Sequence, residues 1–429
     1  MSQQLPPNMP PFPAESPFHY HLGELYCEEV SLATITATVD TPAYVYSRSE
    51  ILRRARAFVE TTAEVTGGMA TVCYAVKANA NPALLHILVE SGLGTDVTSG
   101  GELFLALHAG AAPEKIIFSG VGKKSVEMAE ALTAGIRAIH VESEMELLAV
   151  ADVAERLGVV APVGVRVNPN ISAETHPYIS TGLHGHKFGV PRERAVSMLR
   201  EAAASPWLRP VGIAAHIGSQ ITDLDPFRQA VMFLVQLADD LRSEGIPLEY
   251  IDAGGGLGID YQGTAPGVAE WVRRIGPLVA GAGYQLVVEP GRSIVGPSGA
   301  LLSRVVYTKT QGAKKFVIVD AGMTDLIRPT LYQAYHPIVP VSGSTRLAEV
   351  VDIVGPICET SDFLARDRAI PPAERGDLLA ILHAGAYGYA MSSNYNGHLR
   401  PVEVLVDGDS FHVIRWRQSY EDLLAGAVE

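Results

Sequence analysis

The chain has 429 residues, of which 47% are hydrophobic and 19% charged, a composition typical of a globular protein with room for two domains. Its formal net charge of −14 argues against nucleic acid as a partner, because an acidic surface repels phosphate backbones. The cysteines Cys27, Cys73 and Cys358 are too few and too widely spaced for a disulfide framework or a zinc site, and they favour a reducing cytoplasm.

Residues 1–40 are expected to be partly disordered and partly joined to a β-rich domain. Met1–Ser16 is rich in proline and has no basic residue followed by an apolar stretch, so it does not resemble a signal peptide. Tyr20–Val30 is expected to add a strand to the C-terminal domain. No apolar run approaches the roughly 20 residues of a membrane-spanning helix, so we expect no membrane partner and a cytoplasmic location.

Between residues 41 and 295, short β-rich runs alternate with helical stretches such as Phe227–Leu241, in which apolar residues recur every three or four positions. The eight runs are Val72–Val76, Gly94–Val97, Lys115–Phe118, Arg137–Val141, Val163–Val167, Val211–His216, Leu248–Asp252 and Gln285–Glu289. Eight such repeats over roughly 250 residues are typical of a (β/α)8 barrel, the TIM barrel. An open doubly wound sheet is the alternative, and eight repeats favour closure.

From residue 296 to residue 429, strand-like runs follow one another without long helices, and Gly and Pro separate them. They are Val305–Tyr307, Phe316–Asp320, Glu349–Val354, Leu378–His383, Val402–Val406 and Phe411–Trp416. This pattern predicts a mostly β second domain, either a sandwich or a barrel.

The predicted barrel strands end in unusual sequences, and the C-terminal strand ends are where a (β/α)8 barrel places its chemistry. Six of these ends are polar or rich in glycine: Tyr74–Asn79, Asp96–Glu102, Arg166–Pro169, His216–Gln220, Asp252–Gly258 and Glu289–Arg292. Because a closed barrel brings these ends to one rim, they predict a functional site there.

Lys77 is the candidate nucleophile of this rim. It follows an apolar strand, where desolvation favours the neutral amine that attacks an aldehyde to form a Schiff base. Taken alone, a lysine at a strand end more simply extends to solvent. The other strand ends reverse that interpretation: Gly254–Gly256 can converge N–H groups on a phosphate, and Glu289 can keep a pyridine nitrogen protonated. A flexible turn and a structural salt bridge are the simpler alternatives for these two motifs.

The second domain contains further candidate residues. Cys358 and Glu359 follow a strand, and a thiol can donate a proton in a dry site, although a small buried residue is the simpler alternative. Gly385–Gly397 mixes aromatic and small residues, as binding loops do. Arg328 and Tyr332 add a basic group and a phenol from a loop.

From about Thr41 to Tyr420 these motifs resemble the fold-type III decarboxylases that use pyridoxal 5′-phosphate (PLP), and among them the diaminopimelate decarboxylases. The resemblance implies that Lys77 holds PLP as a Schiff base, with Asp96 behind the lysine and His216 stacked on the ring. It implies that Cys358 gives a proton to Cα after CO2 has left. The remaining residues implied to bind the cofactor are Ser219, Gly255, Gly256, Glu289, Gly291, Arg292 and Tyr387.

The resemblance also implies a substrate, meso-2,6-diaminopimelate, whose decarboxylation yields L-lysine in the last step of lysine biosynthesis. Planar arginines suit a distal carboxylate, and a diamine-forming ornithine or arginine decarboxylase would have no need of Arg328. A carboxylated-polyamine decarboxylase of the same fold is a further alternative, and the pair Arg292 and Arg328 argues against it. Cys358 and Glu359 are implied to come from the partner subunit of a homodimer, so that the active site is shared. The residues implied to bind substrate are Arg292, Arg328, Tyr332, Glu359 and Tyr387.

Three alternatives compete with this interpretation. Lys187 is the rival Schiff-base lysine, but it follows a probable loop rather than a strand. An amino-acid racemase would need an acid–base group on each face of the substrate, and the Cys358–Glu359 pair argues against it. A non-catalytic regulatory homologue would be expected to lose Lys77 or Cys358, and both are present.

Overall fold

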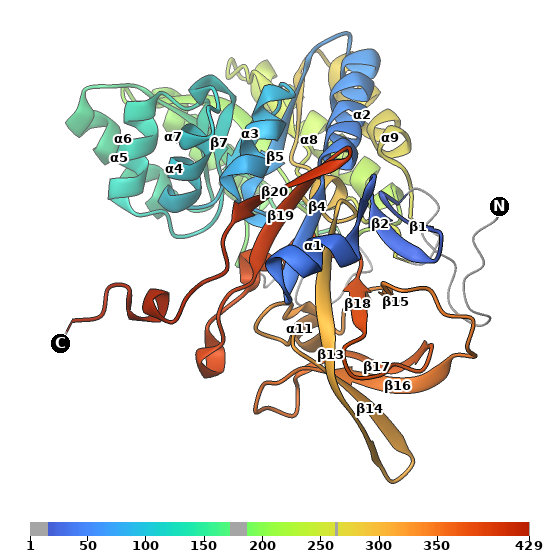
Figure 1. Ribbon diagram of the computed structural model, residues 1–429. Coiled ribbons are helices and arrows are strands. Elements are labelled where there is room, and N and C mark those ends of the chain that lie inside the picture. The colour runs from blue at the N-terminus through green and yellow to red at the C-terminus, as the bar shows by residue number, and fades with distance from the viewer. Residues whose placement is uncertain (1–15, 172–186, 262–264, 429) are drawn as a thin grey trace. The chain divides into compact units, whose positions relative to one another are not determined.

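The computed structural model describes residues 16–171, 187–261 and 265–428, and these divide into two compact units (Figure 1). Within the described ranges, the barrel unit contains residues 54–259 and 265–293, and the β unit contains residues 16–53, 260–261 and 294–428. The predicted fold class is confirmed, because one unit is a closed parallel barrel and the other is mostly strand.

The strands of the barrel unit are parallel and close in the order β10-β11-β12-β5-β6-β7-β8-β9. They are β5 (Ala70–Ala75), β6 (Gly94–Val97), β7 (Ile116–Phe118), β8 (Ala138–Val141), β9 (Ala161–Arg166), β10 (Leu208–Ala214), β11 (Tyr250–Asp252) and β12 (Gln285–Val288). The pairing of β12 with β5 closes the barrel and excludes the open doubly wound sheet. All eight predicted strands are confirmed.

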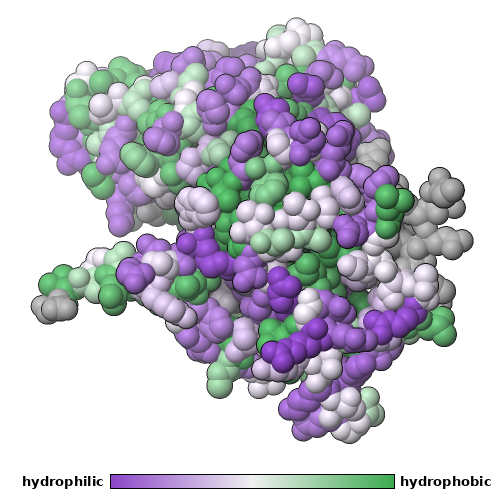
Figure 2. All heavy atoms as spheres, viewed as in Figure 1, coloured by the Kyte–Doolittle hydropathy of each residue, from purple (hydrophilic) through white to green (hydrophobic). Residues whose placement is uncertain are grey.

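Helices follow these strands, and side chains cap several of them at the start. Asn81 accepts a hydrogen bond from the Ala83 amide at 3.0 Å, and Ser99 accepts one from the Glu102 amide at 3.2 Å. Hydrophilic residues predominate over the outer helices in Figure 2. None of the helices in the described ranges is long and apolar enough to cross a membrane. Helix α2 (Arg48–Thr66) precedes β5. The helices that follow the strands are α3 (Pro82–Glu90), α4 (Gly100–His108), α5 (Ser125–Ala134), α6 (Glu144–Leu157), α7 (Arg192–Ala204), α8 (Asp225–Ser243), α9 (Val268–Gly281) and α10 (Arg292–Val295).

Two large rings fill the barrel interior where two strands carry glycine. A Cβ added to Gly212 would lie 2.4 Å from two atoms of the buried Tyr250 ring, and one added to Gly164 would lie 2.5 Å from Cδ2 of His140. Both distances are shorter than any carbon–carbon contact, so the two glycines leave the space that the rings occupy.

Gly212→Ala is therefore expected to destabilise the fold by about 1–3 kcal/mol, the usual cost of overpacking a close-packed core. Gly281→Ala is the matched control, because a Cβ there meets nothing within 4 Å. Chemical denaturation of both variants measures the difference. An unchanged free energy of unfolding for Gly212→Ala would contradict the packing described.

The β unit contains a small antiparallel sheet and a larger one, in which the described strands run β17-β16-β14-β13-β4-β19-β20 and β18 joins β13 to β15. The small sheet consists of β1 (Phe18–His21), β2 (Glu24–Cys27) and β3 (Val30–Ser31), and α1 (Leu32–Val39) follows it. The larger sheet consists of β4 (Ala43–Ser47), β13 (Gly299–Gln311), β14 (Lys314–Val319), β15 (Ile338–Pro340), β16 (Glu349–Val354), β17 (Phe363–Ile370), β18 (Leu378–Ile381), β19 (Val402–Asp407) and β20 (Ser410–Arg415).

The β unit includes three segments that were expected in the barrel domain: residues 41–53, 260–261 and 294–295. Residues 41–53 lie in the β unit because β4 pairs with β13 and with β19. The N-terminal strands belong to the same unit, since Leu25 and Cys27 pack in one core with Leu302 of β13. Strands β15 and β17 were not predicted from the sequence.

Candidate active site

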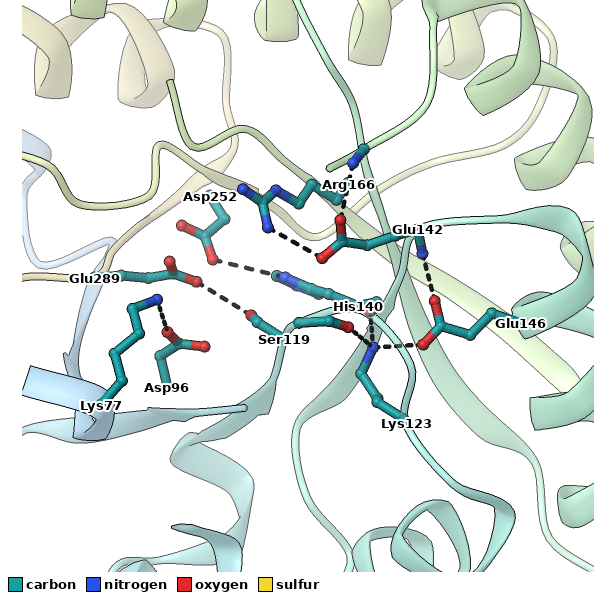
Figure 3. Close-up of polar contacts among 12 residues, drawn as sticks. Lys77, Asp96, Ser119, Lys123, His140, Glu142, Glu146, Arg166, Asp252 and Glu289 are labelled. Carbon is teal, nitrogen blue, oxygen red and sulfur yellow. Dashed lines mark hydrogen bonds and ion pairs between the residues drawn. The ribbon is translucent and has the colours of Figure 1, made fainter. Parts of the chain in front are cut away.

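Lys77 lies in the short 3-10 turn Val76–Ala78 that directly follows β5. Its Nζ is 3.3 Å from Oδ2 of Asp96, at the end of the neighbouring β6 (Figure 3). The Asp96 side chain is fully buried, and within the described residues its Oδ1 has no hydrogen-bond partner. A buried carboxylate thus fixes the amine at the C-terminal end of the barrel.

Glu289 lies at the end of β12 in a cluster of buried ionisable groups. It shares a side-chain hydrogen bond with Asp252. One carboxylate oxygen each of Glu289 and Asp252 and one ring nitrogen of His140 lie within 4.8 Å of one another. Burial, followed by the charges of Asp252 and Asp96, raises the pKa of Glu289 well above its usual range. Burial also raises the pKa of Asp252 to about 6. The raised pKa favours the protonated form of Glu289, which can donate its proton to a basic ring nitrogen.

The glycine triplet after β11 forms a cradle that a side chain would fill. Gly254 and Gly256 have φ of +67° and +100°, a region that favours glycine. A Cβ on Gly255 would lie 2.1 Å from the carbonyl oxygen of Glu289, and one on Gly256 would lie 2.3 Å from that of Gly218. The backbone of Gly255 and Gly256 therefore packs directly on the backbone of Glu289 and Gly218, which follow the two neighbouring strands. Without side chains in the way, the backbone N–H groups of this segment can approach a phosphate.

Three further predicted residues join this cradle. Nη2 of Arg292, at the start of α10, donates to Oγ of Ser219 at 2.9 Å. Gly291 packs against the residues beside the lysine: a Cβ there would lie 3.0 Å from Cβ of Ala78. A cation, a hydroxyl and glycine backbone thus meet near Lys77, a donor set suited to the phosphate of PLP.

His216, just after β10, is held as a neutral ring. Its Nδ1 accepts a hydrogen bond from the Gly255 amide at 3.2 Å. Burial lowers the pKa of His216 well below its usual value, and the charges of Lys77 and Arg166 lower it further. A neutral imidazole at this place suits stacking on an aromatic ring better than ion pairing.

A polar network lies beside these residues (Figure 3), and apart from Arg166 its members were not predicted from the sequence. Nζ of the buried Lys123 donates to the carbonyl of His140 at 2.6 Å and to Glu146 at 2.7 Å, and burial lowers its pKa. Burial also lowers the pKa of His140 to about 3, so this ring stays neutral. Arg166 pairs with Glu142 at 3.0 Å. These residues form no sequence motif. The only signal in the sequence that could have indicated them is a polar residue within or next to an apolar barrel strand.

The remaining predicted residues lie in the β unit. Cys358 and Glu359 are exposed in a loop after β16. The Asp362 carboxylate shapes this loop by accepting the Ile357 amide at 2.7 Å, and Asn396 accepts the Cys358 amide at 3.0 Å.

Arg328 begins the short helix α11 (Arg328–Tyr332) and is buried. The loop that carries Cys358 and α11 are joined, because Oγ1 of Thr330 donates to the Ser361 carbonyl at 2.6 Å. Tyr332 ends α11, and Tyr387 has a φ of +56° between two closely packed glycines. Within the β unit, the structure therefore brings Arg328 and Tyr332 to the loop of Cys358 and Glu359.

Comparison with known proteins identifies the family. The family model described as pyridoxal-dependent decarboxylase, pyridoxal binding domain, matches residues 48–296. The diaminopimelate decarboxylase of Aquifex aeolicus is 45% identical over 412 residues, which cover 96% of this chain and 97% of that protein. That of Pseudomonas aeruginosa is 47% identical over 410 residues, which cover 95% and 98%.

Solved structures of diaminopimelate decarboxylases also have the fold of this chain. Diaminopimelate decarboxylase from Helicobacter pylori, complexed with L-lysine, superposes with a TM-score of 0.88 at 40% identity and covers 92% of this chain and 98% of that one. The enzyme from M. jannaschii gives a TM-score of 0.91 at 37% identity, with 96% and 98% covered. The chain belongs to the diaminopimelate decarboxylases, within the PLP-dependent decarboxylase family.

Proposed function

We propose that the protein decarboxylates meso-2,6-diaminopimelate to L-lysine and CO2. The observation that carries this proposal is Lys77, held by Asp96 on the same barrel rim as Glu289 and the glycine cradle, in a chain of this family. PLP, when bound, accepts the electron pair left on Cα as CO2 departs.

The barrel residues would bind and orient the cofactor. Lys77 would hold it covalently and exchange it for the substrate amine, while Asp96 orients Nζ. Glu289 would donate its retained proton toward the pyridine nitrogen. The residues that would bind the phosphate and ring are His216, Ser219, Gly255, Gly256, Gly291, Arg292 and Tyr387.

The β-unit residues would recognise and protonate the substrate. Cys358 would deliver a proton to Cα, and Glu359 would pair with the distal ammonium. The distal carboxylate would bind to Arg292, Arg328, Tyr332 and Tyr387.

Cys358 and Glu359 are exposed in a single chain, whereas a proton donor works best in a site that excludes water. We therefore propose that they complete the active site of a second copy in a homodimer.

The thiols support a cytoplasmic location. Cys27, Cys73 and Cys358 are all free, and Cys358 must stay reduced to act as a proton donor.

Release of CO2 from meso-diaminopimelate, ornithine, arginine and lysine tests the proposal. We expect kcat/KM for diaminopimelate to exceed the others by at least about 10²-fold, because a site built to pair with a substrate group rejects analogues that lack it. If ornithine or arginine is turned over faster, diaminopimelate is the wrong substrate, but the assignment as a PLP-dependent decarboxylase stands.

A further inference from the structure

The Arg328 guanidinium is held at one nitrogen by two uncharged groups of the β unit. Its Nη1 donates to the Tyr261 hydroxyl at 3.0 Å and to Nε2 of His336 at 2.8 Å. Arg328 is 4% exposed and His336 is fully buried. Since Nη1 carries two N–H bonds, these two contacts use both of its protons.

The neighbours of His336 also determine which ring nitrogen carries the proton. Nδ1 lies 2.9 Å from the carbonyl oxygen of Leu382, which can only accept a hydrogen bond. The guanidinium can only donate, so Nε2 must offer a lone pair. Only a neutral ring with its proton on Nδ1 satisfies both partners.

The larger sheet fixes the place of this ring. Ile338 of β15 pairs with Ile381 of β18, and the Leu382 amide donates to the Pro337 carbonyl at 2.8 Å. Nη1 of Arg368, on β17, donates to the His336 carbonyl at 2.6 Å. The residue that offers the acceptor to Arg328 is therefore held by contacts to three strands of the larger sheet, β15, β17 and β18.

We propose that His336, with Tyr261, is a positioning residue that orients Arg328 for the distal carboxylate of the substrate. The inference rests on the proposed function, in which Arg328 binds that carboxylate. A bidentate carboxylate meets two N–H groups along one edge of a guanidinium, so fixing both Nη1 protons fixes where that edge lies. A misplacement of about 1 Å can cost on the order of 10²-fold.

Two substitutions separate the two contacts of His336. His336→Gln places an amide oxygen near the position of Nε2 and so keeps the acceptor for Arg328. His336→Asn places an amide N–H near the position of Nδ1 and so keeps the bond to Leu382 while losing the one to Arg328. A residue needed only for packing would tolerate both similarly or neither.

The readout is equilibrium binding of two ligands to the PLP-loaded protein. L-Lysine carries the carboxylate in question, and 1,5-diaminopentane has the same carbon chain and amines without it. We expect His336→Asn to weaken L-lysine about tenfold and His336→Gln by no more than about threefold, with 1,5-diaminopentane unchanged in both. Equal losses in both variants, or equal losses for both ligands, would overturn the inference.

Two more variants make the outcome decisive. Arg328→Ala tests the premise, because unchanged L-lysine binding in this variant would show that Arg328 does not bind the carboxylate. If Arg328→Ala weakens L-lysine but His336→Asn does not, only the positioning role of His336 is wrong. Should the buried His336 variants fail to fold, Tyr261→Phe removes the other acceptor while keeping the ring. It is expected to weaken L-lysine severalfold and spare 1,5-diaminopentane, and unchanged L-lysine binding would refute the positioning role.

Discussion

Lys77→Ala protein is expected to be colourless after purification with PLP and to lose at least about 10³-fold in turnover, the scale seen when a nucleophile is removed from a working site. No other group would remain at the end of β5 to hold the cofactor covalently beside Asp96. The visible absorbance of the purified protein and CO2 release from diaminopimelate measure the two effects.

Two controls isolate the covalent role of Lys77 from its charge. Lys77→Arg keeps a cation near the buried Asp96 carboxylate, but a guanidinium stays protonated and cannot attack an aldehyde, so this variant is also expected to be colourless. Lys187→Ala removes the rival lysine, which is exposed and lies over the Phe188 ring at 5.3 Å, and should stay yellow. A yellow Lys77→Ala protein would rule out Lys77 as the attachment site.

The barrel and its rim could be predicted because their signals are local. Most barrel strands are short apolar runs. Lys77, His216 and Glu289 follow such runs within two residues, and Asp96 lies in the second half of β6. Once the runs close into a barrel, their ends must meet, so the sequence order alone is enough to group these side chains.

The parts that could not be predicted depend on contacts between distant positions. β4 resembles any short apolar run, and only its pairing with β13 and β19 assigns it to the β unit. β17 contains Arg366, Asp367 and Arg368, which hide its strand character; it ends the strand order of its sheet, where charged residues protect an edge.

Site residues were missed for the same reason. The bond between His336 and Arg328 spans a helix and depends on the pairing of β15 with β18, for which no sequence motif exists. Likewise, Asp252 could be noted as a strand end, but the raised pKa of Glu289 requires the two carboxyl groups to be buried together. A local sequence pattern shows which ionisable side chains are present, whereas their burial and their partners in the fold determine which of them are protonated.

Cys358→Ala is expected to retain the yellow cofactor and to lose on the order of 10²–10⁴ in turnover, the usual contribution of a positioned proton donor. Cys358 lies in the β unit, in a loop held by Asp362 and Asn396, so its removal leaves Lys77 and the glycine cradle intact. Cys358→Ser is the conservative variant. Because a hydroxyl is a weaker acid than a thiol, it should recover only part of the rate that Cys358→Ala loses. Unimpaired turnover by Cys358→Ala would remove the proton-donor role.

Mixing two inactive variants tests whether this thiol acts on the partner's cofactor. In a shared-site homodimer, a subunit with Lys77→Ala can still offer Cys358 to the intact Lys77 of a subunit with Cys358→Ala. After dissociation and reassembly, roughly a quarter of full activity should return, because half of the dimers are mixed and each mixed dimer contains one complete site. If each chain instead built its own site, both residues would have to be intact in one subunit, and no mixture of the two variants could recover activity.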